Sequence, residues 1–339
     1  MSARIINLAW VAMACAGRLV AQELEVIGVS SDEVPANLGC WGYWLDEDGS
    51  RVAFCSLADN LVEGDTNDAM DSFVRDRETG TTIRISVSTA GVEGDRDSSI
   101  AMISDDGSVV AFDSLARNLV ANDTNRDMDV FVRDLGAGIT ECVSVRPSGV
   151  PAQGGGSVRG LSADGTIVLF ASSSDQLVPG DRNGLGDLFI RDRAADTTTR
   201  VSVGTGGMEA QGSSFYGMIS PDGRYVAFQS DAANLDPDDI DDDYDVYLHD
   251  RQTGVTVLAT RGADGADLPS HTTVRGLSAD GRFVFFTALV DAVFPELDDD
   301  SGGYFRRDLV TGDIRCLAHQ TFVWVLPGWI VGEERSGCA

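Results

Sequence analysis

A period of 58 residues constrains this chain more than any other feature of its sequence. The pair Asp-Gly recurs five times at that spacing, at Asp48-Gly49, Asp106-Gly107, Asp164-Gly165, Asp222-Gly223 and Asp280-Gly281. An aromatic residue keeps the same spacing, at Phe73, Phe131, Phe189, Tyr247 and Phe305. A strict period over five copies, without insertions, indicates a repeat architecture.

Each repeat contains four short β patterns. In the second copy, apolar segments at 100–103 and 109–112 lie on either side of Asp106-Gly107, a pair that favours a tight hairpin turn. A third β segment covers 129–133, and a fourth follows another turn, as at 83–87 in the first copy. Because helical periodicity is absent, the pattern predicts an all-β fold, a β-propeller of four-stranded blades.

The repeat resembles that of the TolB-like propellers with WD-type blades. The residues that carry the resemblance are Ser104-Asp105-Asp106-Gly107, Val110-Ala111-Phe112 and Asp129-Val130-Phe131-Val132-Arg133-Asp134, and the most similar copy has Ser220-Pro221-Asp222-Gly223 with Val226-Ala227-Phe228. The resemblance covers about residues 40–319. It implies the fold but no single activity, because propellers include binding proteins, scaffolds and several classes of enzyme.

The first 21 residues are typical of a secretory signal peptide, with Arg4, an apolar run at 5–16 and small residues before Gln22. We therefore expect an exported protein, periplasmic or extracellular, whose residues 22–339 form one propeller domain. A wrongly assigned start or an amphipathic leader is the alternative, and a lipid-modified Cys15 would attach the protein to a surface. No later segment reaches about 18 apolar residues, so we expect no transmembrane segment.

The number of blades depends on how the ring closes. The segment 24–30 lies one period before 83–88 and could supply a fourth strand to the last blade. The fifth repeat already has a candidate fourth strand at 313–318, and the tail has an apolar run at 322–326. We expect five blades. The alternative is a sixth, rudimentary blade built from the tail and 24–30.

The loop between the second and third strands of a repeat has the pattern Asp-x-(Asn/Asp)-x-x-x-Asp in the first four copies. The residues are Asp65, Asn67, Asp71; Asp123, Asn125, Asp129; Asp181, Asn183, Asp187; and Asp239, Asp241, Asp245. Closely spaced oxygen ligands suit a hard cation, so Ca²⁺ is the candidate cofactor for these loops.

Turn chemistry is the competing interpretation of the same residues. Asp and Asn side chains accept hydrogen bonds from nearby backbone amides in turns. The spacing also differs from that of an EF-hand loop, which has an invariant Gly and a terminal bidentate Glu. The fifth copy departs from the pattern, with Leu297, Asp299 and Gly303 at the corresponding positions.

The charge of the chain indicates what kind of partner it can bind. The chain has 25 basic and 54 acidic residues, a formal net charge of −29, which argues against nucleic acid. In a four-stranded blade the acidic loops all emerge on one face, which should attract cations or basic peptides. A solvated acidic surface without a partner is the alternative.

Familiar catalytic patterns are absent from the sequence. The three histidines, His249, His271 and His319, form no His-Glu-x-x-His motif, and no Gly-x-Ser-x-Gly elbow occurs. We therefore expect a non-enzymatic, monomeric propeller that binds a protein, peptide or glycan. A carbohydrate-active enzyme, lyase or glycosidase, is the alternative, and a non-repeating acidic cluster with Arg or His in the central channel would favour it. A purely structural module is a third possibility.

Five cysteines remain if a signal peptidase cuts after Ala21. Cys40 and Cys55 flank the first hairpin and are candidate disulfide partners, while Cys316 could pair with Cys338. Cys142 would then be left unpaired, as a small buried residue.

Overall fold

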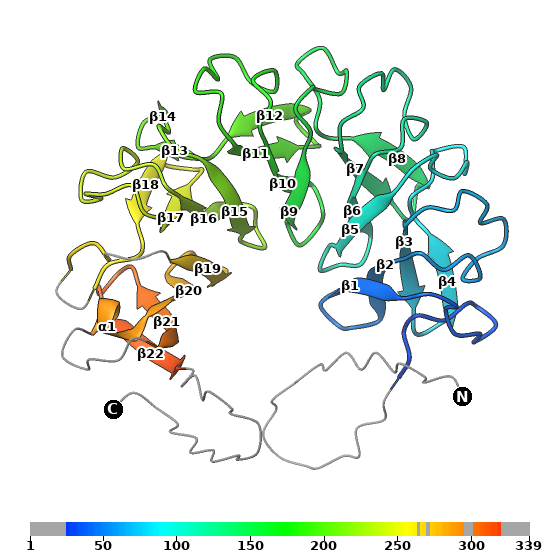
Figure 1. Cartoon of the computed structure of the whole chain (residues 1–339), viewed down its shortest axis with the longest axis horizontal. Coiled ribbons are helices and arrows are strands. Elements are labelled where there is room, and N and C mark those ends of the chain that lie inside the picture. The colour runs from blue at the N-terminus through cyan, green and yellow to red at the C-terminus, as the bar shows by residue number, and fades with distance from the viewer. Residues whose placement is uncertain (1–24, 263–264, 269–271, 295–300, 320–339) are drawn as a thin grey trace, which may run out of the picture.

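Five four-stranded antiparallel sheets make up the described part of this computed structural model, which covers residues 25–262, 265–268, 272–294 and 301–319. The sheets lie side by side along an arc, and the first strand of each sheet faces the centre of that arc (Figure 1). In every sheet the strands pair in chain order, as in blades of a propeller. The all-β propeller fold predicted from the repeats is confirmed.

The first two sheets consist of β1 (Cys40–Leu45), β2 (Arg51–Ser56), β3 (Asp71–Asp76) and β4 (Thr81–Arg84), and of β5 (Ser98–Ile103), β6 (Val109–Ser114), β7 (Asp129–Asp134) and β8 (Ile139–Cys142). The third and fourth consist of β9 (Ser157–Leu161), β10 (Ile167–Ser172), β11 (Asp187–Asp192) and β12 (Thr197–Arg200), and of β15 (Ser214–Ile219), β16 (Tyr225–Ser230), β17 (Asp245–Asp250) and β18 (Val255–Leu258). The fifth contains β19 (Thr273–Leu277), β20 (Phe283–Leu289), β21 (Gly302–Asp308) and β22 (Ile314–His319). A small hairpin, β13 (Val203–Gly204) with β14 (Met208–Glu209), and the short helix α1 (Val290–Val293) complete the described elements.

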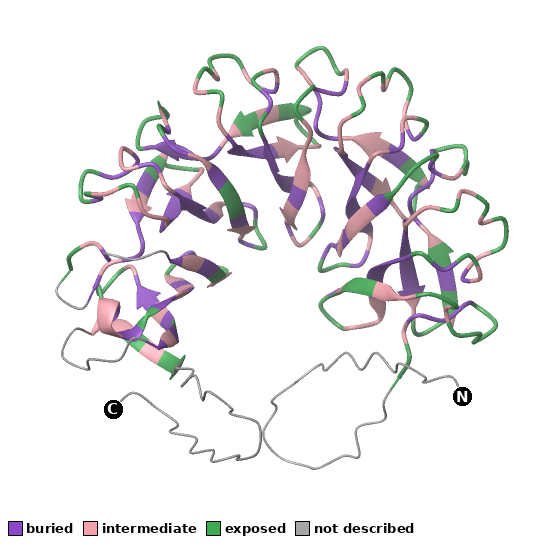
Figure 2. Ribbon diagram, viewed as in Figure 1, coloured by how far each residue is buried: buried purple, intermediate pink, exposed green. Residues whose placement is uncertain are grey.

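The core lies between neighbouring sheets. The two middle strands of a sheet are almost entirely buried, whereas the loops at the rim are exposed (Figure 2). Each sheet has one aromatic pair across these strands, such as Phe112 and Phe131, whose stacked ring centroids are 5.7 Å apart. This aromatic position is the one that the 58-residue period predicted, and it anchors every blade in the same way.

The predicted Asp-Gly hairpin turns are present and are closed by their own side chains. In the second repeat, Asp106 Oδ1 accepts hydrogen bonds from Ser104 Oγ at 2.7 Å and from the Ser108 amide at 2.9 Å. Gly107 adopts a φ of +68°, a conformation that residues with a Cβ rarely adopt. The Asp106 amide also donates to the Ala163 carbonyl, so consecutive turns are joined from blade to blade.

The closure of the ring lies largely outside the described residues. The fourth strand expected at 313–318 is present as β22. In the described part of segment 24–30, Val29 forms an isolated bridge to Pro35, and its carbonyl accepts a hydrogen bond from Thr82 Oγ1 of β4 at 2.6 Å. The run at 322–326 and the leader at 1–21 fall outside the described residues, so five blades and the signal peptide stay predictions.

The expected pairing of Cys40 with Cys55 is wrong, since both thiols are free. Cys40 lies opposite Ser56 in the β1–β2 register, and Cys55 lies opposite Trp41. Because neighbouring residues of a strand point to opposite faces, the two thiols are separated by the sheet. Cys142 is free, as predicted, and Cys316 is disulfide-bonded, although its predicted partner Cys338 lies outside the described residues.

Candidate functional site

The acidic loops connect β2 to β3, β6 to β7, β10 to β11 and β16 to β17. In this antiparallel order they emerge from the same end of each sheet, opposite the Asp-Gly turns. The last Asp of each pattern is the first residue of the third strand and is fully buried, at Asp71, Asp129, Asp187 and Asp245. The loops thus bring carboxylates into the interior at one end of every blade.

A hydroxyl on the segment after the fourth strand holds each of these buried carboxylates. Asp71 Oδ1 accepts from Ser86 Oγ at 2.5 Å, and the same contact recurs at Asp129, Asp187 and Asp245. In the fourth repeat the donor is Thr260, at 2.6 Å. This repeated contact fixes the position of one carboxylate oxygen and leaves the other, Oδ2, free for a second partner.

The Asn of the pattern supplies that partner in the first three repeats. Asn67 Oδ1 accepts the Ala69 amide at 2.9 Å, which is the turn chemistry expected of Asn. Its amide nitrogen donates to Asp71 Oδ2 at 3.1 Å and to the Gly94 carbonyl at 2.9 Å. Asn125 and Asn183 make the same contacts. These Asn residues therefore direct an N–H, not an oxygen, at the neighbouring carboxylate.

An arginine occupies the centre of the acidic loop in the first and third repeats. Arg84 Nη1 lies 3.2 Å from Asp65 Oδ1, 3.2 Å from Asp71 Oδ2 and 2.9 Å from Glu93 Oε2. Arg200 Nη1 contacts Asp181, Asp187 and Glu209 at 2.9–3.2 Å in the same way. Each guanidinium lies where a cation between three carboxylates would lie.

The second repeat lacks this arginine. Cys142 takes its place and Pro151 takes the place of the Glu, so two loop carboxylates, Asp123 and Asp129, remain. Asp123 Oδ1 is buried and accepts no hydrogen bond from the described residues. Asp127 adds a contact to the Gly154 amide at 2.9 Å.

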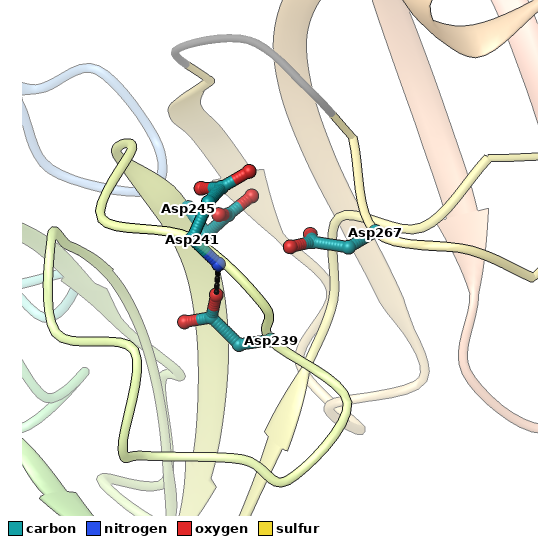
Figure 3. A group of neighbouring side chains, drawn as sticks. All are labelled: Asp239, Asp241, Asp245 and Asp267. Carbon is teal, nitrogen blue, oxygen red and sulfur yellow. Dashed lines mark hydrogen bonds between the residues drawn. The ribbon is translucent and has the colours of Figure 1, made fainter.

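The fourth repeat is the most acidic of the four. Leu258 replaces the arginine, Asp241 replaces the Asn, and Asp267 replaces the Glu. One carboxylate oxygen each of Asp239, Asp241, Asp245 and Asp267 lies within 4.8 Å of the others. Three of these side chains belong to the loop before β17, and Asp267 reaches them from the segment after β18 (Figure 3).

Hydrogen bonds satisfy this cluster only in part. Asp239 Oδ1 accepts from the Asp241 amide at 3.2 Å, and Tyr247 Oη donates to Asp239 Oδ2. Asp241 Oδ1 accepts the Asp243 amide at 2.9 Å. Asp245 Oδ2 is buried and has no hydrogen-bond partner among the described residues, because the side chain of Asp241, unlike that of Asn, has no N–H to donate.

Burial raises the pKa of several carboxyls at these sites. It raises the pKa of Asp65, Asp129 and Asp181 to about 6. For Asp245, burial and the neighbouring Asp267, Asp239 and Asp241 raise the pKa to about 8. The largest of these increases thus falls on the carboxylate that has neither an Asn nor an Arg beside it.

The structure therefore brings together the predicted residues of each of the first four repeats. It also adds residues that the loop pattern did not include: Arg84, Glu93, Arg200, Glu209 and Asp267. The repeats could have indicated that the four loops differ, because the equivalent positions 84, 142, 200 and 258 carry Arg, Cys, Arg and Leu. In the fifth repeat, Leu297 and Asp299 lie outside the described residues, and Gly303 lies in β21.

A second polar group lies between β6 of the second sheet and the inner strand β9 of the third. Asp113 is fully buried in β6 and accepts from Ser157 Oγ and from the Val158 amide, both at 2.7 Å. Arg159 Nη1 donates to Ser157 Oγ at 2.7 Å, and its guanidinium lies 5.7 Å from the centre of the Tyr216 ring. This group does not repeat, since Cys, Ala, Gln and Thr occupy the positions equivalent to Asp113.

Comparisons with solved structures agree with the fold. The chain resembles an oligogalacturonate lyase in complex with manganese, at 15% identity and a TM-score of 0.55, over 85% of this chain and 68% of that chain. The chain is a β-propeller. TolB structures are also among the matches, as the resemblance predicted: TolB from Acinetobacter baumannii (16% identity, TM-score 0.44, 80% of this chain and 52% of that one) and a putative TolB from Agrobacterium tumefaciens (16%, 0.47, 83% and 81%).

This chain thus spans about half the length of the Acinetobacter protein. No family model and no curated protein matches the chain. Within the described residues, no helix has the length and apolar character needed to cross a membrane.

Proposed function

We propose that this chain is an exported, non-enzymatic propeller that binds a protein or peptide partner through the face formed by its acidic loops. The observation that carries the proposal is the placement of four Asp-rich loops at one end of four successive blades. Exposed carboxylates such as Glu63, Asp68 and Asp242 lie on these same loops. A chain with a net charge of −29 and four acidic loops on one face favours a partner with a basic segment.

Calcium belongs to this proposal as the cofactor of the loops. Of the twelve residues of the four loop patterns, those of the fourth repeat are the candidate ligands, because its loop has the densest set of carboxylates. In the first and third repeats, Arg84 and Arg200 occupy the corresponding position. A bound divalent cation would hold the loop ends in fixed positions and present a defined surface to the partner.

Binding of a short arginine-rich peptide to the full chain tests the proposed face. The variant Glu63→Gln/Asp68→Asn/Asp242→Asn removes three exposed charges from the acidic loops and should weaken binding at least about 3-fold. The variant Glu47→Gln/Asp105→Asn/Glu78→Gln removes three exposed charges from the opposite end of the blades and should leave binding unchanged. Equal weakening by both variants would show non-specific attraction and reject the proposed face.

The group at Asp113, Ser157 and Arg159 favours a second candidate function, a carbohydrate-active enzyme. It supplies a non-repeating carboxylate and an arginine on an inner strand, beside the ring of Tyr216. Incubation with polygalacturonate and detection of unsaturated products would test lyase activity. Product formation that Arg159→Ala abolishes would support the enzyme and overturn the non-enzymatic proposal.

A further inference from the structure

The four acidic loops differ in what compensates their carboxylates. In the first and third repeats, one guanidinium neutralises part of a group of three carboxylates. In the fourth repeat four carboxylates meet, and no arginine among the described residues forms an ion pair with any of them. The nearby Arg261 is paired instead with Asp236 and Asp238.

Asp245 Oδ2 gives an independent sign that a ligand is missing from this cluster. The equivalent oxygen, Oδ2 of Asp71 or of Asp187, receives both an Asn amide and an arginine. In the fourth repeat both donors are replaced, by Asp241 and Leu258, and the fully buried Asp245 Oδ2 finds no partner in the part of the chain that the structure describes. A buried carboxylate oxygen without a partner costs free energy unless a cation compensates it.

The geometry of the cluster fits a calcium ion. Two oxygens bound to one Ca²⁺ at about 2.4 Å can lie at most about 4.8 Å apart. The four carboxylate oxygens meet that limit. All four groups are hard oxygen ligands, and two of them, Asp241 and Asp267, come from different loop segments.

We propose that the fourth repeat binds one Ca²⁺ through Asp239, Asp241, Asp245 and Asp267, and that Arg84 and Arg200 take the place of this ion in the first and third repeats. The ion compensates the cluster and ties the loop before β17 to the segment after β18. The inference deepens the calcium part of the proposed function and rests on it. Its test uses the metal alone, so a failure here is distinguishable from a failure to bind a peptide.

Calorimetric titration of Ca²⁺ into the EDTA-treated full chain is the test, with thermal unfolding in parallel. We expect one site with a dissociation constant of about 1 mM or tighter. At a Ca²⁺ concentration of about 100 times that constant, the melting temperature should rise by about 4 °C.

Two variants locate the site. Asp267→Asn removes one ligand charge, and Asp241→Asn restores the residue of the other three repeats. Each should weaken Ca²⁺ binding at least about 10-fold. Asp241→Asn should also raise the melting temperature of the metal-free protein, because the new amide can donate to Asp245 Oδ2. A higher melting temperature would show that the variant is folded, so its weaker Ca²⁺ binding would reflect the loss of a ligand.

Two controls make the assignment falsifiable. Glu209→Gln removes the equivalent charge from the arginine-filled third repeat and should leave Ca²⁺ binding unchanged. Asp123→Asn removes a loop carboxylate, the counterpart of Asp239, from the second repeat and should also leave Ca²⁺ binding unchanged. The proposal is overturned if the chain binds no Ca²⁺ at about 10 mM, if binding survives both fourth-repeat variants, or if either control abolishes it.

Discussion

The first and fourth repeats both bring several carboxylates together in one loop, but different side chains lie beside those carboxylates. In the first, Arg84 lies among Asp65, Asp71 and Glu93, and Asn67 donates to the buried Asp71. In the fourth, Leu258 and Asp241 occupy the corresponding positions, and four carboxylates face one another. The backbone pattern is the same, so the comparison teaches that two positions, 84/258 and 67/241, decide whether such a loop carries its own cation or, under our proposal, takes one from solution.

The largest expected effect comes from breaking the first repeat. Arg84→Leu removes the guanidinium that forms ion pairs with three carboxylates, two of which have side chains no more than 5% exposed. Loss of one partner from a buried ion pair should lower the free energy of unfolding by about 3–5 kcal/mol. Urea unfolding measures this loss in the free energy of unfolding. Arg126→Leu, at an exposed loop position, is the control and should change stability by less than about 0.5 kcal/mol.

A second substitution in the same variant should give the first repeat a Ca²⁺ site. Arg84→Leu combined with Asn67→Asp gives the first repeat the side-chain pattern of the fourth. We expect Ca²⁺ to restore much of the lost stability, since the ion would replace the guanidinium. A double variant that Ca²⁺ does not stabilise would contradict the equivalence of the two repeats.

Asp113 extends the comparison to a buried carboxylate outside the loops. Burial raises the pKa of Asp113 to about 7, above the ordinary value of 3.8. The folded carboxyl then retains a proton that the unfolded chain releases, so its contribution to stability is full below about pH 4 and is lost as the pH rises to about 7.

Asp113→Asn should therefore stabilise the protein at pH 8 by about 1–3 kcal/mol and have little effect at pH 4. Urea unfolding at a series of pH values measures the difference between variant and parent. Asp105→Asn, at an exposed turn position, should show no such trend. A difference that does not change with pH would show that Asp113 is not protonated in the folded state.

Tyr247 gives a smaller test, in the fourth repeat itself. Its hydroxyl donates to Asp239 and lies 3.3 Å from the Ala232 carbonyl oxygen, whereas the first three repeats have Phe at this position. Tyr247→Phe should cost about 1–2 kcal/mol in the metal-free protein, because Asp239 loses a buried donor. Thermal unfolding with Tyr216→Phe as the exposed control measures the effect, and an equal change in both variants would count against it.

The sequence predicted the fold because the 58-residue period repeats both the Asp-Gly turns and the aromatic pair of each blade. Asp106 with Gly107 and Phe131 with Phe112 show the physical basis, a closed turn and a stacked pair in every copy. The register of a single strand was harder to predict. Cys40 and Cys55 flank the first hairpin, but they point to opposite faces of the sheet.

The loop pattern predicted where carboxylates gather but not what compensates them. Arg84 lies 13 residues after Asp71, on the far strand of the blade, and only the fold brings the two side chains together. The role of Asn67 was also hidden, because an Asn offers both an oxygen and an N–H, and the contacts to Asp71 and Gly94 decide which one faces the carboxylate.

Native mass spectrometry of the full chain in Ca²⁺ tests the central claim most directly, because it counts bound ions. The account predicts one Ca²⁺ per chain, lost in Asp241→Asn, and a second ion in Arg84→Leu/Asn67→Asp. No bound ion, or four ions that bind the loops of all four repeats alike, would contradict it.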